Sequence, residues 1–208
     1  MRRSEFAMMN AEETSLFLNE MSFGYLGTVG EDGWPLLTPL NFVYHGGAVY
    51  FHGSRAGAKM ANLKARPKVT FAVAKEYALI PSYVLDPKLA CPATAYFKSV
   101  LIRGYAENVQ DPHVKAEALT AFMQKLQPEG GYDPIDPADK HYGPRLAGVA
   151  IVKIHVEELT AKYKFGQNLS EQDRGKVIHA LEERHRELDE ETAALMRQYC
   201  PHHKEREN

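Results

Sequence analysis

The chain has 208 residues, of which 44% are hydrophobic and 25% charged, as in most soluble globular proteins. Its 25 Lys and Arg and 27 Asp and Glu give a net charge of −2, which argues against a nucleic-acid-binding or membrane-surface protein. Two cysteines argue against a disulfide framework, and no apolar run is long enough for a signal peptide or a membrane helix. We therefore expect a single cytoplasmic domain over residues 1–208.

The first part of the chain predicts a short helix followed by antiparallel strands. Asn10 and Glu13 form a capping pattern at the start of that helix, and Gly24 ends it. Glycine-rich turns separate strand-sized apolar runs, which is typical of a meander. The expected strands cover residues 25–29, 34–44, 48–52 and 69–74. A short helix, opened by Ser54, is expected over residues 56–64 and ends before Pro67.

The second part predicts two more strands, over 96–108 and 149–156, and a helix over 111–127. Residues 77–95 and 128–146 are expected to form long loops. A capping box at Ser170 to Asp173 begins one long C-terminal helix, about 170–199, before a polar tail, 200–208. Six strands with inserted helices indicate an α+β fold, an antiparallel barrel with peripheral helices.

One candidate site lies in the turn from Gly53 to Lys59, between an expected strand and an expected helix. Free N–H groups at a helix start attract an anion, and Lys59 adds a full positive charge, to which Arg55 can contribute. The spacing is not that of a P-loop, because Met60 stands where Ser or Thr is needed. The turn predicts either a phosphate site or an ordinary solvated basic turn.

A second candidate combines the run Leu37 to Asn41 with His52, which ends the third expected strand. Pro39 inside a strand indicates an edge, a bulge or contact with a ligand. Thr38 and Asn41 in an apolar run suit a planar heteroaromatic ligand. His52 can transfer a proton or serve as a structural donor. The alternative is a bulged barrel strand with a structural histidine.

Two further segments could add cations to an anion site. Lys98 and Ser99 lie in the strand 96–108, where the alternative is an exposed strand face. The segment from Lys162 to Asn168 carries two lysines, an aromatic ring and two amides, and either closes over an anionic cofactor or merely connects two elements. We predict no metal site, because Cys200, His202 and His203 are terminal and lack a second ligand pair.

These stretches follow one another in an order that is specific, although each is common by itself. The first set of motifs comprises the runs 25–29, 32–35, 38–44 and 50–53, followed by Lys59. The second set is Cys91 to Val100, which follows the pattern Cys-x-x-Thr-x-x-Tyr/Phe-x-Ser-Val. The third set is Lys164 to Asn168, followed by Asp173-Arg174. Over residues 10–185 the chain resembles the pyridoxamine-5′-phosphate-oxidase-like family. The first two sets resemble its nitroimidazole-resistance (Nim) branch, and the last resembles its PaiB-like members.

The resemblance implies a split β-barrel homodimer with flavin mononucleotide (FMN) at the subunit interface, FAD being the alternative. It implies that Ala58 and Lys59 meet the flavin phosphate with help from Lys98 and Ser99, and that Gln167 and Asn168 reach the flavin from the partner subunit. His52 would lie on the substrate side as the catalytic residue. The implied flavin-binding residues are Leu37, Thr38, Pro39, Leu40, Asn41, Phe51, His52, Ala58, Lys59, Lys98, Ser99, Gln167 and Asn168.

The function implied in this way is an FMN-dependent oxidoreductase that passes electrons to a small organic acceptor, such as a nitroaromatic, with NAD(P)H as the electron source. No Gly-x-Gly-x-x-Gly motif is present, so a nicotinamide would bind transiently. One alternative is a non-catalytic flavin- or haem-binding sensor or regulatory protein. The other is a pyridoxamine-phosphate-type oxidase, against which the missing C-terminal Arg-x-His motif argues.

Overall fold

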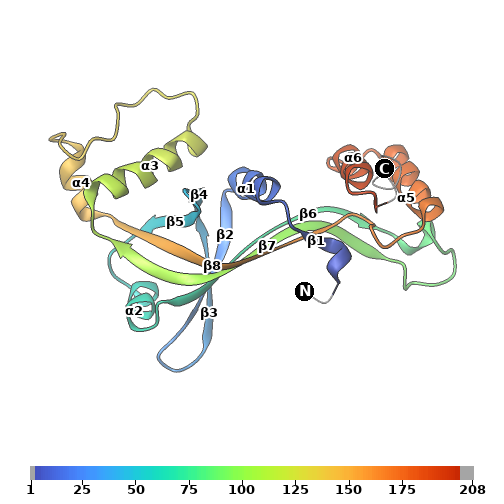
Figure 1. Ribbon diagram of the computed structural model, residues 1–208, viewed down its shortest axis with the longest axis horizontal. Helices are drawn as coiled ribbons and strands as arrows, with labels where there is room; N and C mark the ends of the chain where they lie inside the picture. The colour runs from blue at the N-terminus through green and yellow to red at the C-terminus, as the bar shows by residue number, and fades with distance from the viewer. Residues whose placement is uncertain (1–2, 202–208) are drawn as a thin grey trace. The chain divides into compact units, whose positions relative to one another are not determined.

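The computed structural model describes residues 3–201 and has an α+β fold built on one eight-stranded sheet (Figure 1). The order across the sheet is β3-β2-β6-β7-β8-β5-β4, and β1 pairs with β8. The strands are β1 (Ala7–Met8), β2 (Phe23–Val29), β3 (Pro35–Asn41), β4 (Val43–His45), β5 (Ala48–Gly53), β6 (Lys68–Ile80), β7 (Thr94–Val109) and β8 (Ala150–Lys164). The α+β fold class predicted from the sequence is confirmed.

Six α-helices lie within the described residues, together with two short 3-10 turns at Ser4–Phe6 and Ser82–Val84. The helices are α1 (Ala11–Glu20), α2 (Ala58–Ala65), α3 (Pro112–Leu126), α4 (Tyr142–Gly148), α5 (Glu171–Arg184) and α6 (Asp189–Gln198). Two predicted caps are confirmed, since the Asn10 side chain accepts from the Glu12 and Glu13 N–H groups and Ser170 accepts from the Asp173 N–H.

Several predicted bounds were wrong, chiefly because buried strand residues continue into segments that looked irregular. The run 34–44 is two strands, separated at the buried Phe42. β6 extends to Ile80, since Tyr77, Ala78 and Ile80 are buried, so the loop predicted at 77–95 is reduced to residues 81–93. β8 likewise continues eight residues beyond the predicted end at 156.

The single C-terminal helix predicted over about 170–199 is wrong, because α5 and α6 are separate helices. His185 ends α5 in the left-handed conformation, with φ at 53°. The Arg184 guanidinium donates to both carboxylate oxygens of Asp189, at 2.8 and 2.5 Å, and the Arg186 N–H donates to the same carboxylate. This bidentate pair fixes the turn between the two helices.

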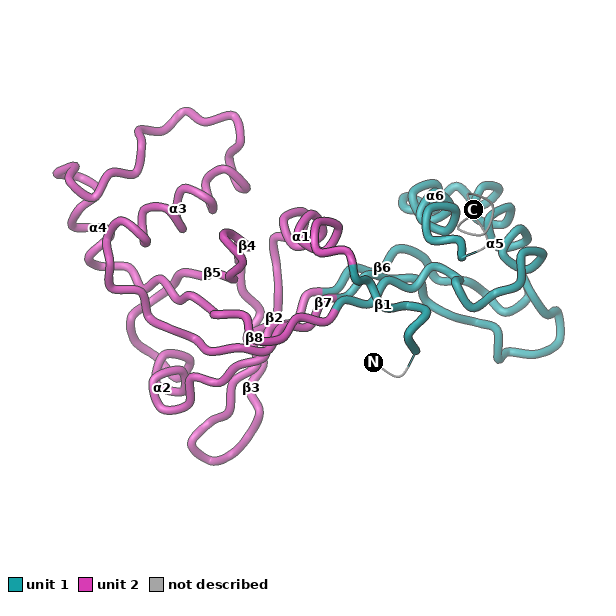
Figure 2. The backbone as a smooth tube through the Cα atoms, viewed as in Figure 1, with its two compact units in different colours: residues 1–9, 74–99, 161–208 teal, residues 10–73, 100–160 magenta. Residues whose placement is uncertain are grey.

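The described chain divides into two compact units, although the sequence indicates one domain (Figure 2). Unit 1 comprises residues 1–9, 74–99 and 161–208, and unit 2 comprises residues 10–73 and 100–160. The sequence shows no linker between them because β6, β7 and β8 each pass from one unit into the other.

In unit 2, α3 covers strands β4 and β5, and Phe122 is buried against Val43, Tyr50 and Ile151. Gly104 on β7 is required by close backbone approach, because a Cβ there would stand 1.9 Å from the His155 carbonyl oxygen. Lys125 at the end of α3 donates to the carbonyls of Leu18, Met21 and Phe42, which ties α1 to the sheet.

In unit 1, the core is aromatic. The ring of Phe165 lies 5.3 Å from that of Tyr77, 6.2 Å from Tyr96 and 5.7 Å from Tyr199. Arg174 on α5 is 4% exposed and donates to the carbonyls of Gly166, at 3.0 Å, and Met196, at 2.6 Å. This arginine therefore ties α6 to the loop that follows β8.

Both cysteines are free, and Cys200 is buried, although it was assigned to the polar tail. Residues 202–208 of that tail, including His202 and His203, lie outside the described residues. Within residues 3–201 no group of three or more His, Cys, Asp and Glu side chains is arranged to hold a metal ion. The same part of the chain contains no helix with the length and hydrophobicity to cross a bilayer.

Candidate functional site

The predicted phosphate turn forms an open helix start in unit 2. Gly57 precedes α2 with a φ of 109°, and no side chain caps the first N–H groups of the helix. Ser54, predicted to cap this helix, accepts instead from the Ala56 N–H at 3.2 Å, because the helix begins at Ala58 rather than at residue 56. Arg55 is directed away, donating to the Ala147 carbonyl at the end of α4.

Lys59, in the first turn of α2, lies over the ring of Phe51, with its ammonium 5.1 Å from the ring centroid. Within the described part of the chain this ammonium forms neither a hydrogen bond nor an ion pair. A Cβ at Gly53 would lie 3.4 Å from the ammonium, so the glycine leaves room beside it. Partial burial lowers the pKa of Lys59, a cost that an incoming anion would offset.

His52 lies between Phe51 and Gly53 at the end of β5, and its ring meets Phe122 edge-on at 4.9 Å. Burial and, to a smaller extent, the Lys59 ammonium hold the pKa of His52 below its usual value. The imidazole is therefore neutral at pH 7, with one nitrogen free to donate and the other to accept. Phe51, His52 and Lys59 are thus brought together, as the sequence predicted.

The run Leu37 to Asn41 lies on β3, which pairs only with β2 and is an edge of the sheet. The edge position explains why Pro39 is tolerated in a strand. Leu37 and Pro39 are exposed, Thr38 is half-buried and Leu40 is buried. The Asn41 amide donates to the Ser22 carbonyl at 3.2 Å. The strand therefore offers an apolar outer surface, and the Asn41 amide nitrogen has a backbone partner.

The remaining predicted residues belong to unit 1. Lys98 lies between two rings, with its ammonium 5.3 Å from Tyr77 and 5.2 Å from Tyr163, and Ser99 follows it on β7. The Gln167 amide holds its own loop, since it accepts from the Phe165 N–H and donates to the Tyr163 carbonyl, both at 2.8 Å. The predicted set is therefore divided between the two units of one chain.

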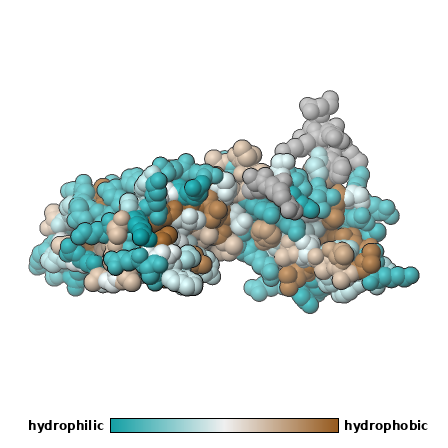
Figure 3. Space-filling view, turned by 90° about the horizontal axis from the view of Figure 1, so that it is seen from below, coloured by the Kyte–Doolittle hydropathy of each residue, from teal (hydrophilic) through white to brown (hydrophobic). Residues whose placement is uncertain are grey.

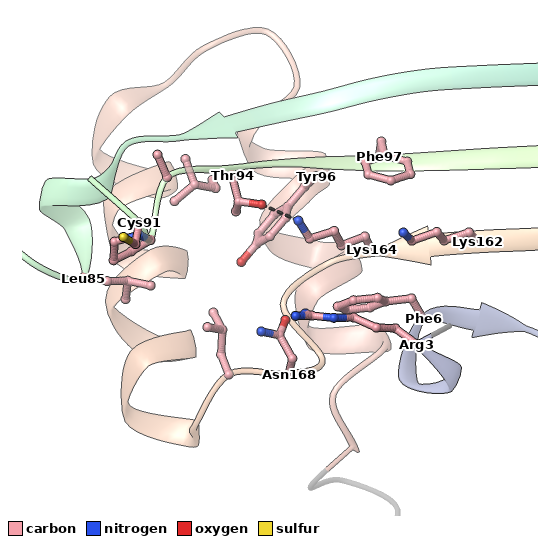
Figure 4. A pocket seen from close by; sticks show the side chains of 14 residues that line it. Arg3, Phe6, Leu85, Cys91, Thr94, Tyr96, Phe97, Lys162, Lys164 and Asn168 are labelled. Atoms are coloured by element: carbon pink, nitrogen blue, oxygen red, sulfur yellow. Dashed lines mark hydrogen bonds between the residues drawn. The ribbon is translucent and has the colours of Figure 1, made fainter. Parts of the chain in front are cut away.

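A cavity of about 670 Å³ lies within unit 1, and Asn168 is the only predicted binding residue among those lining it. Figure 4 shows Arg3, Lys164 and Asn168 at this cavity, with Leu85 and Cys91 across it. The lining residues are Arg3, Phe6, Ile80, Leu85, Cys91, Pro92, Ala93, Thr94, Tyr96, Phe97, Lys162, Lys164, Asn168 and Leu169. Sequence reasoning singled out the lysines of this set but missed Arg3 and Phe6, which come from the other end of the chain.

The family to which the chain belongs follows from the comparison with known proteins. Residues 10–163 match the family model described as pyridoxamine 5′-phosphate oxidase, which is well over half of the chain. The chain belongs to the pyridoxamine 5′-phosphate oxidase family. The matched range contains Phe51, His52 and Lys59, which we call the Lys59 corner, and it ends within β8.

Three proteins with known names are similar to this chain in sequence or in structure. The protease synthase and sporulation protein PAI 2 of Bacillus subtilis is 29% identical over 199 residues, covering 92% of this chain and 93% of that protein. The flavocytochrome Anf3 of Azotobacter vinelandii is 26% identical, with a TM-score of 0.65, covering 82% of this chain and 75% of that one. A candidate 5-nitroimidazole antibiotic resistance protein of Bacteroides thetaiotaomicron is 20% identical, with a TM-score of 0.60 over 75% of this chain and 85% of that one.

These comparisons confirm the family resemblance and the fold inferred from the sequence. These relatives are described as a flavocytochrome, a protease synthase and sporulation protein, and a candidate antibiotic resistance protein. Proteins with different descriptions therefore share this fold, and a function for the chain must be argued from the residues of the site.

Proposed function

We propose that this chain is an FMN-dependent oxidoreductase that reduces a small organic acceptor, with a nitroaromatic as the model substrate and NAD(P)H as the electron source. The observation that carries the proposal is the unpaired Lys59 ammonium beside Phe51, at the uncapped start of α2. A phosphate there would receive a full positive charge and free backbone N–H groups together. The family membership of the chain supports a flavin as the group that carries this phosphate.

The residues around this corner suit a flavin in two further respects. The exposed apolar side of β3 at Leu37 and Pro39 offers a surface for a planar ring. His52, neutral at pH 7, can hold or transfer a proton at a ring nitrogen on the substrate side. When bound, the flavin supplies hydride acceptance and electron transfer. The roles of Lys98, Ser99, Gln167 and Asn168 rest on the family resemblance alone.

We propose further that the protein is a homodimer that encloses the flavin between subunits, in the cytoplasm. Phe23, Tyr25 and Leu37 are 53%, 51% and 74% exposed. They share one face of the sheet, because Tyr25 pairs with Pro39 and Gly27 with Leu37. Hydrophobic side chains also reach the surface seen in Figure 3. An exposed apolar sheet face supports a protein–protein contact, and two free cysteines fit a reducing compartment.

The test is the visible spectrum of the purified protein and the mass of the extracted cofactor, which separates FMN from FAD. We expect Lys59→Ala to weaken flavin retention by about 10- to 100-fold, since a charge-assisted hydrogen bond contributes about 1.5–3 kcal/mol. Lys64→Ala, an exposed lysine of the same helix, is the matched control and should leave retention unchanged. A colourless protein that ignores added FMN and FAD would sink the proposal.

A second candidate is a non-catalytic flavin- or haem-binding regulator. The likeness to the sporulation protein PAI 2, which covers nearly all of both chains, favours it. Steady-state oxidation of NADPH and NADH with a panel of nitroaromatic acceptors separates the two candidates. Tight cofactor binding without turnover would favour the regulator, and turnover that follows flavin occupancy would favour the oxidoreductase.

A further inference from the structure

The side chains of Phe51 and His52 lie on opposite faces of β5, because neighbouring residues alternate along a strand. Phe51 lies beneath the Lys59 ammonium of α2. His52 shares its face with Tyr50 and, across the strand pair, with Ile151. Tyr50 and Ile151 belong to the core that α3 covers (Figure 1). The imidazole therefore faces α3, while His52 as a whole remains exposed and accessible to a ligand.

One face of α3 is fixed at both ends to other elements of unit 2. Lys115, Ala118, Phe122 and Lys125 follow at intervals of three, four and three residues, so they form one stripe of the helix. The Lys115 ammonium donates to two carbonyls at the end of α4, at 2.9 and 3.0 Å. The Lys125 ammonium donates to carbonyls at the end of α1 and between β3 and β4. Phe122 therefore lies between two anchored positions.

Phe122 brings a rigid ring against the imidazole of His52. The two rings meet edge-on, with centroids 4.9 Å apart and an angle of 85° between their planes. Phe122 is 2% exposed and packs in the core beside Val43 and Tyr50. The second side-chain torsion of a histidine has only a broad preference of its own, so a fixed neighbouring ring selects the orientation of the imidazole. The same contact keeps water from one side of the imidazole.

The other groups near His52 do not fix its orientation. Burial is the main cause of the lowered pKa of His52, and the Lys59 ammonium on α2 is the smaller cause. Arg55, in the turn before α2, donates to the backbone of α4, and both lysines of the α3 stripe bind carbonyls of other elements. Ile151 is the residue of β8 opposite His52. Between residues 3 and 201, the imidazole forms no hydrogen bond or ion pair.

We propose that Phe122 is a positioning residue for His52, because its ring, held between the two anchored ends of the α3 stripe, fixes the plane of the imidazole and leaves the imidazole accessible to the acceptor. This role rests on the proposed function, in which His52 holds or transfers a proton. Phe122 itself does not touch the reacting atoms. A displacement of about 1 Å in a catalytic group can lower a rate by about 100-fold, so we expect the effect of Phe122 in kcat.

The first test is the titration of His52 in the protein as purified, followed by NMR of the histidine ring signals. Comparison with His52→Gln assigns the signal. In the wild type we expect a pKa below the usual value of about 6.5. Phe122→Leu keeps an apolar side chain in the core and removes the ring, so the imidazole gains water and its pKa should rise toward 6.5.

The second test is steady-state turnover of the flavin-loaded protein. Phe122→Leu should lower kcat by about 10- to 100-fold and leave the KM values near those of the wild type. The acid limb of the kcat/KM profile should move to higher pH together with the pKa of His52. Adding Phe122→Leu to His52→Gln should lower kcat no further, because the ring acts through the histidine.

Phe71→Leu is the matched control. It removes a buried ring of the same unit that contacts Phe42 at 5.0 Å instead of His52, so it should change neither the titration nor kcat. If Phe122→Leu does not fold, Phe122→Met, which fills the space with a flexible side chain, replaces it in both tests.

The titration separates the role of Phe122 from the proposed function, because it requires neither flavin nor turnover. A protein without turnover would defeat the proposed function, and the titration would still show whether Phe122 sets the state of the imidazole. Three results would overturn the role of Phe122. They are an unchanged His52 titration in the folded variant, a double variant slower than His52→Gln, and an equal shift of the pKa in Phe71→Leu.

Discussion

The Lys59 corner of unit 2 and the cavity of unit 1 both place cations against aromatic rings, but the chain builds them differently. Phe51, His52 and Lys59 lie within nine consecutive residues, on one strand, one turn and one helix. The cavity instead draws on the N-terminus, the ends of β6, β7 and β8, and the loops at 81–93 and 165–169. A site made by one local turn can be recognised in a sequence, whereas a site made by converging segments is visible only after folding.

The two regions also differ in their enclosure. Lys59 lies in the first turn of α2, whose N-terminus has no side-chain cap, and in the proposed homodimer a partner subunit would complete the site. The cavity is bounded by residues of unit 1 alone. We therefore expect turnover and dimerisation to depend on unit 2, and the stability of α5, α6 and the cavity walls to depend on the packing of unit 1. The following predictions test that division, from the largest expected effect to the smallest.

The largest effect is expected at His52. His52→Gln should lower turnover by about 100- to 10,000-fold, the usual contribution of a general acid or base, while flavin retention stays near wild type. Steady-state kinetics and the visible spectrum measure the two effects. His45→Gln, at the end of β4, is the matched control. If turnover survives in His52→Gln, the His52 ring only packs against Phe122. The proton transfer proposed for unit 2 must then be assigned to another group.

The next effect concerns the packing of unit 1. Arg174→Met should leave the carbonyls of Phe165 and Met196 without the guanidinium donor, whereas the Gly166 carbonyl still accepts from the Leu169 N–H. At about 1–3 kcal/mol for each of the two carbonyls, the loss should total about 2–6 kcal/mol. Hydrogen exchange should rise in α5, α6 and the loop 165–169. Arg186→Met, an exposed arginine of the same unit, should leave the exchange unchanged. Equal loss of protection throughout unit 2 would contradict the separation of the two regions.

A comparable change is expected at the apolar face of unit 2. Leu37→Asp should weaken dimerisation by more than about tenfold, because a charge would be buried in the contact. Light scattering coupled to size-exclusion chromatography measures the molar mass as a function of concentration. Leu89→Asp removes another leucine, 59% exposed and in unit 1, and should leave the mass unchanged. A wild-type monomer, or a Leu37→Asp dimer as tight as the wild type, would show that this face is not the interface.

The smallest effect is a pH dependence of stability. The pKa of His52 is lowered in the folded protein, so below about pH 6.5 the unfolded chain takes up a proton that the folded chain does not. This group therefore contributes stability above pH 6.5 that is lost as the pH falls. Urea unfolding at pH 7.5 and 5.5 should show a smaller loss for His52→Gln than for the wild type. An identical loss in both proteins would mean that His52 titrates normally.

Local signals in the sequence predicted local structure well. The caps at Asn10 and Ser170 need only a side-chain oxygen two or three residues before an N–H group, and both formed as expected. The fold class followed from the number and spacing of the apolar runs, and the family comparison confirms it. The errors arose where distant contacts override local preference. The break between α5 and α6 depends on the Arg184–Asp189 pair, which the helical pattern of the segment does not reveal.

The sequence by itself determined the α+β class, the meeting of Phe51, His52 and Lys59, and the family, because each depends on residues close together or on motifs in a fixed order. Only the tertiary structure decided that the Lys59 ammonium is unpaired, that Gln167 is taken up in holding its loop, and that Arg3 joins Lys162 and Lys164 around a cavity. Pairing, burial and the gathering of charge depend on which distant segments the fold brings together, and a linear pattern does not contain that information.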